Sequence, residues 1–198
     1  NRVLTDNGGG TINSEQNLTF NGTTLGVTGS LEQGIFNSAT TFSHAQGNSS
    51  IASGRYSHAE GELSVATASE SHAEGYNTTA SGDFSHSEGN QTLASVTYAH
   101  SEGWRTQAIN IAAHAEGQYT TASGASTHAE GDTTIAIGQA SHAEGSGTIS
   151  FGGASHAEGY NTLSSGSYSH AEGENTKAFS DYSHAEGRNT SASNLWAH

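Results

Sequence analysis

The 198-residue sequence contains no cysteine, no proline and no methionine. Without cysteine, neither a disulfide framework nor a zinc–thiolate site can form. Without proline, long ladders of paired backbone meet no residue that lacks an N–H group. The absence of methionine, even at the first position, predicts that the sequence is a piece of a longer chain.

Apolar and charged residues are both scarce. Hydrophobic residues make up 31% of the chain and charged residues 12%, against roughly 45–50% and about 25% in ordinary globular domains. This content is too low for one thick core, but a thin repetitive structure can bury it because each unit packs only on its neighbours. No apolar run approaches the roughly 20 residues of a membrane span, and no signal peptide is visible.

Basic residues are rarer still. Five Lys and Arg stand against 19 Asp and Glu, which gives a formal net charge of −14. Such a balance argues against nucleic acid and anionic membranes as partners, because both attract positive charge. The sequence therefore predicts neither nucleic-acid binding nor membrane insertion.

The dominant feature is a strict repeat. All 12 histidines are spaced 14 residues apart, from His44 to His198, with no insertion or deletion. The motif around each is Ser-His-Ala-Glu-Gly, as in Ser57–Gly61, and a Thr-x-Ala segment follows it in most repeats. Fourteen residues are too few for the common helical repeats but suit strand, turn, strand, turn. Eleven such coils, stacked about 4.8 Å apart, would be about 50 Å long.

Glycine is expected at the turns, since it tolerates tight bends and positive φ. The glycine three residues after each histidine is therefore predicted to mark a coil corner. The predicted corners are Gly61, Gly75, Gly89, Gly103, Gly117, Gly131, Gly145, Gly159, Gly173 and Gly187.

Strand alternation assigns the faces of each coil. Alanine lies on one face of both strand types, so an alanine-on-alanine interior is predicted. The predicted interior comprises Ala59, Ala66, Ala73, Ala80, Ala115, Ala122, Ala129, Ala136, Ala143, Ala157, Ala171, Ala178 and Ala185.

Histidine and glutamate share the opposite face of the first strand, and they stay nearly constant while other positions diverge. A solvated face would not hold two ionisable residues so fixed, so we expect this face to pack against copies of the same chain, with charge-assisted hydrogen bonds between the pair. The predicted interface residues are His58, Glu60, His72, Glu74, His86, Glu88, His100, Glu102, His114, Glu116, His128, Glu130, His142, Glu144, His156, Glu158, His170, Glu172, His184 and Glu186.

These half-repeats, Ser-x-Ala-x-Gly and Thr-x-Ala-x-Gly, resemble the head repeats of trimeric autotransporter adhesins. That family typically has Ser-Val-Ala-Ile-Gly, whereas here histidine and glutamate replace valine and isoleucine. The Ser-His-Ala-Glu-Gly form is similar to repeats in phage tail-fibre proteins. The resemblance covers about residues 37–198 and implies a left-handed parallel β-roll that assembles as a homotrimer.

The N-terminal part predicts a separate element. Residues 17–27 read as two short strands around an Asn21-Gly22 turn, which is typical of a hairpin. Residues 1–30 resemble a leader of phage structural proteins. We therefore expect two domains: residues 1–35 as a β-hairpin leader and residues 36–198 as the β-roll of about eleven coils.

The columns also allow other interpretations. Histidine and glutamate repeated at every level could hold zinc, nickel or iron, but an inter-chain hydrogen-bonded ladder is favoured, and no metal or other cofactor is predicted. Catalysis is disfavoured because no level is singled out. The threonine column raises ice binding as a third reading. Aromatic residues two positions before histidine could bind sugars, although covering the coil corners is favoured.

The combined prediction is an all-β, homotrimeric, left-handed parallel β-roll without enzymatic activity. Its expected function is a rigid spacer in an extracellular fibre, foremost a phage tail fibre of the virion, with contact to a host-surface glycan or protein. The alternative is the head of a bacterial cell-surface adhesin that binds matrix or glycan.

Overall fold

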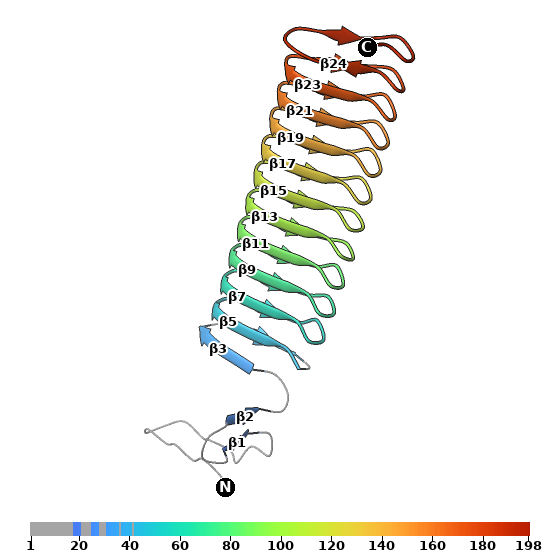
Figure 1. The fold of residues 1–198 in the computed structure, drawn as a ribbon. Helices are drawn as coiled ribbons and strands as arrows, with labels where there is room; N and C mark the ends of the chain where they lie inside the picture. The colour runs from blue at the N-terminus through green and yellow to red at the C-terminus, as the bar shows by residue number, and fades with distance from the viewer. Residues whose placement is uncertain (1–17, 21–24, 28–30, 36, 41) are drawn as a thin grey trace.

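The computed structural model describes residues 18–20, 25–27, 31–35, 37–40 and 42–198. The described chain is an all-β parallel solenoid without helices, in which about 14 residues form each coil (Figure 1). Consequently, none of the described residues belongs to a helix long and apolar enough to span a membrane. The predicted fold class, a parallel β-solenoid of 14-residue coils, is confirmed.

One sheet is built from the Ser-His-Ala-Glu-Gly segments, whose histidine begins each strand after the first. Its strands are β3 (Leu31–Ile35), β5 (His44–Asn48), β7 (His58–Glu62), β9 (His72–Tyr76), β11 (His86–Asn90), β13 (His100–Trp104), β15 (His114–Gln118), β17 (His128–Asp132), β19 (His142–Ser146), β21 (His156–Tyr160), β23 (His170–Glu174) and β25 (His184–Ala185).

The second sheet is built from shorter strands that alternate with the first set along the chain. They are β4 (Ser38–Ala39), β6 (Ile51–Ala52), β8 (Val65–Ala66), β10 (Thr79–Ala80), β12 (Leu93–Ala94), β14 (Gln107–Ala108), β16 (Thr121–Ala122), β18 (Ile135–Ala136), β20 (Ile149–Ser150), β22 (Leu163–Ser164), β24 (Lys177–Ala178) and β26 (Ser191–Ala192).

Both sheets keep one register throughout. Each histidine from His44 to His170 pairs with the histidine of the next coil, as His86 does with His100, and each glutamate from Glu60 to Glu158 pairs with the next glutamate. The backbone hydrogen bonds therefore run along the solenoid axis, and like side chains form straight columns. Coils without insertions are what make these columns continuous.

The interior lies between the two sheets and consists of small side chains. All the predicted interior alanines are buried, and most have no exposed surface. The serine or threonine that precedes most of the histidines is buried with them, and so is the one six residues after each histidine from His44 to His170. The threonine column from Thr78 to Thr176 is fully enclosed, so it cannot present the surface array that ice binding requires.

The glycines from Gly61 to Gly173 lie within the long strands and not at the coil corners, which corrects the sequence prediction for them; Gly187 lies in a bend after β25. Gly61, for example, is the fourth residue of strand β7, with φ +110°, and the turn is made by Leu63 at φ +59°. The second turn carries another non-glycine residue at positive φ, such as Tyr56 at +60°. Glycine is needed in the strand because a Cβ on Gly61 would lie 2.1 Å from the carbonyl oxygen of Gly75.

The N-terminal part contains the expected strand pair. Strands β1 (Leu18–Phe20) and β2 (Leu25–Val27) pair antiparallel, while the Asn21-Gly22 turn and residues 1–17 lie outside the described residues. Solenoid pairing begins at Leu31, which pairs with His44, within the range assigned to the leader. This first coil has 13 residues and no histidine, so the period did not reveal it. The division into two domains stays a prediction.

Candidate functional site: the histidine–glutamate stripe

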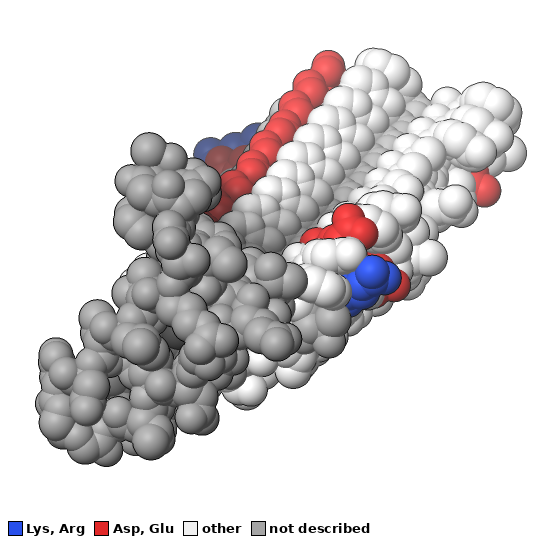
Figure 2. All heavy atoms as spheres, turned by 90° about the horizontal axis from the view of Figure 1, so that it is seen from below, with Lys and Arg blue, Asp and Glu red and all other residues white. Residues whose placement is uncertain are grey.

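The solenoid carries a continuous stripe of histidine and glutamate side chains on the outer face of the long-strand sheet. We call the residues His58 to Glu186 at these two positions the His/Glu stripe. Histidine and glutamate are two residues apart in each strand, so they project to the same side, opposite to the buried alanine between them. Figure 2 shows acidic side chains in a straight row along the solenoid, as the glutamate register requires.

The imidazole rings form a stack along this stripe. From His44 to His156, successive ring centroids lie 4.6 to 4.9 Å apart, with interplanar angles of 12° or less. Near the C-terminal end the rings turn, and the planes of His156 and His170 differ by 30°. The coil spacing thus sets the stack, because one ring follows another at the strand-to-strand distance.

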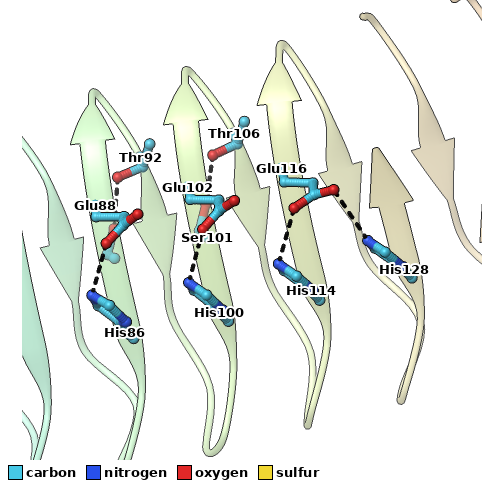
Figure 3. Close-up of polar contacts among 11 residues, drawn as sticks. His86, Glu88, Thr92, His100, Ser101, Glu102, Thr106, His114, Glu116 and His128 are labelled. Carbon is cyan, nitrogen blue, oxygen red and sulfur yellow. Dashed lines mark hydrogen bonds and ion pairs between the residues drawn. The ribbon is translucent and has the colours of Figure 1, made fainter. Parts of the chain in front are cut away.

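Each imidazole of nine consecutive coils, from His58 to His170, points its Nε2 atom at the glutamate of its own coil. The Nε2–Oε2 distances range from 3.4 to 3.9 Å. Glu116 also reaches the next coil: its Oε2 lies 3.8 Å from His114 Nε2 and its Oε1 lies 3.9 Å from His128 Nε2 (Figure 3). Glu144 bridges His142 and His156 in the same manner.

The stripe is half-buried within the single chain. Histidine and glutamate side chains in the central coil keep about a third of their surface exposed, 34% for His114 and 32% for Glu116. The Nε2 atoms, however, have almost no accessible surface and no hydrogen-bond partner within the described chain. Each of these nitrogens is therefore desolvated next to a carboxylate that is too distant for a normal hydrogen bond.

Burial lowers the pKa of several histidines of the stripe. Desolvation lowers the pKa of His58, His72, His114 and His156 below the usual value of 6.5, and the neighbouring imidazoles lower it further. Attraction to the glutamates acts in the opposite direction and is outweighed. These imidazoles are consequently neutral at pH 7, so the pairs are dipole–charge contacts rather than full salt bridges.

The aromatic column lies at one coil corner, apart from the His/Glu stripe. These rings, two positions before histidine, stack in three separate runs, because coils with Glu70 or Ala112 at this position interrupt them. In the last run, Tyr168 and Tyr182 are 5.2 Å apart, and Tyr182 and Trp196 are 4.2 Å apart. These rings remain exposed to solvent. Because the faces of stacked rings are turned towards each other, the column offers mainly ring edges, which suits covering the corner better than stacking on a sugar.

Two features of the interior were not predicted from the sequence. Ser101 replaces an interior alanine, and its hydroxyl lies 2.7 Å from Thr106 Oγ1 (Figure 3); Ser87 pairs likewise with Thr92. In coils with alanine at this position, the hydroxyls of Thr120, Thr134, Thr148, Thr162 and Thr176 have no partner. The sequence does contain a signal for the paired hydroxyls, because the serine and the threonine of each pair lie five residues apart.

Comparison with known protein families gave one kind of match. The YadA head domain repeat (2 copies) matches residues 45–67, 73–95, 115–141 and 129–155, all within the solenoid. A search of curated proteins gave no match. Adhesin heads of this kind are extracellular surface fibres, and their solenoids are typically structural rather than catalytic. With YadA head domain repeats in a parallel solenoid of 14-residue coils, the chain is similar to the head repeats of trimeric autotransporter adhesins.

Proposed function

We propose that the chain is a rigid segment of a homotrimeric extracellular fibre, in which the His/Glu stripes of three copies face the common axis. The observation that carries this proposal is the constancy of the stripe in coils that differ elsewhere. A stripe with one residue pair per coil and one register throughout can align with identical stripes over its whole length. Closed symmetric assembly of identical chains is the common solution for such self-matching surfaces.

The partly exposed imidazole and carboxylate groups support the same arrangement. About a third of each side chain in the central coils is open in the single chain, which leaves surface for a second copy to cover. Buried polar groups need partners to offset desolvation. Imidazoles and carboxylates of neighbouring copies supply donors and acceptors of matching kind at every level.

The function of such a segment is mechanical. Continuous backbone ladders along the axis resist bending, and the described coils contain no proline to interrupt them. A fibre segment of this kind holds other domains at a fixed distance and contacts a host surface glycan or protein. We propose a structural rather than an enzymatic function, since the His/Glu pairs differ little from coil to coil.

Within this class we favour a phage tail fibre on the virion over a bacterial adhesin head. The favouring observation is the replacement of the valine and isoleucine typical of adhesin repeats by histidine and glutamate. An adsorption assay separates the two: soluble protein that competes with phage for bacterial cells supports the tail fibre. Binding to host-tissue matrix or glycan, without competition for bacterial cells, supports the adhesin head.

The facing of the stripe is testable because the chain has no native cysteine. Glu116→Cys places a thiol on the stripe, and Gln107→Cys places one on the exposed outer column of strand β14. Under mild oxidation we expect disulfide-linked dimers within the trimer for Glu116→Cys and none for Gln107→Cys. Equal cross-linking of the two variants, or cross-linking of Gln107→Cys alone, would contradict the proposed facing.

A further inference from the structure

We propose that the His/Glu stripe binds divalent transition-metal ions of the zinc type between successive coils, at two sites in each chain. One site consists of His114, Glu116 and His128, and the other of His142, Glu144 and His156. Each group offers three ligand atoms that lie within 4.8 Å of one another. The sites are built within one chain, so they do not depend on the fibre function proposed above.

The donor set fits such an ion. Two imidazole nitrogens and one carboxylate form the His₂Glu combination that zinc accepts, with a fourth position left for water or another copy. Imidazole also suits copper and nickel. A hard cation such as magnesium prefers an all-oxygen shell, so the class inferred is zinc-like.

The unpartnered nitrogens are the second observation. Nε2 of His114, His128, His142 and His156 is buried and makes no hydrogen bond within the described chain. An ion would therefore give each nitrogen the partner that the protein alone does not provide.

Distances show how little movement is needed. Ligands bound tetrahedrally to zinc, each about 2.1 Å from the ion, are about 3.4 Å apart. Glu116 Oε2 lies 3.8 Å from His114 Nε2, and Glu116 Oε1 lies 3.9 Å from His128 Nε2 (Figure 3). In the second group, Glu144 Oε2 lies 3.9 Å from His142 Nε2, and Glu144 Oε1 lies 3.8 Å from His156 Nε2. The two Nε2 atoms, which lie within 4.8 Å of each other, must approach by up to about 1.4 Å, and rotation of the part-exposed imidazole rings can provide this movement.

Shared ligands limit the number of ions. Six such groups occur among the described residues; five of them run from His100 to His170, and each of these five shares a histidine with the next. One Nε2 lone pair binds one ion, so neighbouring groups exclude each other. Among the described residues, only Glu116 and Glu144 lie within 4.0 Å of histidines of two coils, and their groups have no histidine in common. Two ions per chain follow, rather than one per coil.

The test uses the full chain, freed of metal by a chelator, exposed to excess Zn²⁺ and then desalted. We expect about two zinc ions per chain by elemental analysis, and their loss in the double variant Glu116→Gln, Glu144→Gln. Gln46 already occupies the glutamate column in the coil of His44, where it pairs with Glu60, so glutamine is compatible with the fold. The control Glu62→Gln, outside the ion pairs, is expected to retain both ions.

A spectroscopic readout keeps the proposal testable if the double variant folds poorly. With Cu²⁺ as the probe, the electron paramagnetic resonance spectrum of the unmodified chain should show coupling to two imidazole nitrogens. Zinc retained equally by the chain and its double variant, zinc retained by neither, or copper coupled to fewer than two nitrogens would overturn the proposal. The mass in metal-free buffer is measured in parallel, so a monomer that binds zinc refutes only the fibre.

Discussion

The glycine three residues after histidine should be indispensable in the middle of the solenoid, where it lies within a long strand, and far less so in the last described coil. In Gly117→Ala, the new Cβ would lie 2.2 Å from the carbonyl oxygen of Gly131 in the next coil, at φ +102°. Gly187 has nearly the same φ, +96°, but its nearest neighbour would be Thr190 Cγ2 at 3.9 Å, because no strand follows it in the sheet. Comparison of Gly117→Ala with Gly187→Ala therefore separates backbone strain, which both variants have, from steric conflict between coils, which only Gly117→Ala has.

The magnitudes follow from these contacts. A sparsely populated backbone conformation costs about 1–3 kcal/mol for a residue with a Cβ, and this applies to both variants. Gly117→Ala must in addition push two coils apart by about 1 Å, which weakens roughly two ladder hydrogen bonds of about 1 kcal/mol each. We expect a free energy of unfolding lower by about 3–5 kcal/mol for Gly117→Ala and by at most about 3 kcal/mol for Gly187→Ala.

Thermal unfolding followed by circular dichroism measures the difference. At about 2–4 °C per kcal/mol for a chain of this size, Gly117→Ala should lower Tm by about 10 °C. Gly187→Ala should affect mainly the last coil and lower Tm by a few degrees. Gly153→Ala is the neutral control, since its φ is not positive and its nearest neighbour would be 4.0 Å away. Equal Tm losses at Gly117 and Gly187 would refute the close-approach argument.

Three further predictions concern stability. Ser101→Ala should cost about 1–3 kcal/mol because Thr106 loses its only hydroxyl partner, whereas Ala129→Ser should raise Tm by supplying one to Thr134; denaturant unfolding that ranks them the other way would refute the pairing. The lowered pKa of His58, His72, His114 and His156 means that the unfolded chain takes up protons first, so Tm should be constant above about pH 6.5 and fall below it; a Tm that is unchanged or higher at pH 5.5 than at pH 7.5 would contradict this sign. Leu63→Gly should raise stability by about 1 kcal/mol, because Leu63 is at φ +59°; a lower Tm would show that the exposed leucine contributes more by packing than it loses by strain.

Most of the fold can be predicted from the 14-residue spacing of the histidines. Fourteen residues with two alanine-bearing segments predict two parallel sheets around a thin interior, and the columns lie where strand alternation requires. The role of Gly61 was misread because a glycine needed for a bend and one needed for close backbone approach look alike in sequence. The residues that do turn the chain, such as Leu63 and Tyr56, have ordinary side chains and give no turn signal.

The stripe was predictable only in part. Alternation predicts that His114 and Glu116 share a face, and equal spacing predicts columns. The sequence does not reveal that the imidazoles stack at 4.6 to 4.9 Å with Nε2 hidden from water, because ring orientation depends on side-chain rotation in three dimensions. The balance between burial and attraction to glutamate, which decides the direction of the histidine pKa, likewise needs these distances.

The central claim is that three copies assemble through the His/Glu stripe. Light scattering on a size-exclusion column measures the mass in solution directly, without reference to shape. A trimer has three times the 20.3 kDa mass of one chain, and this is the expected result. A folded species with the mass of a single chain would contradict it and leave the stripe open to solvent.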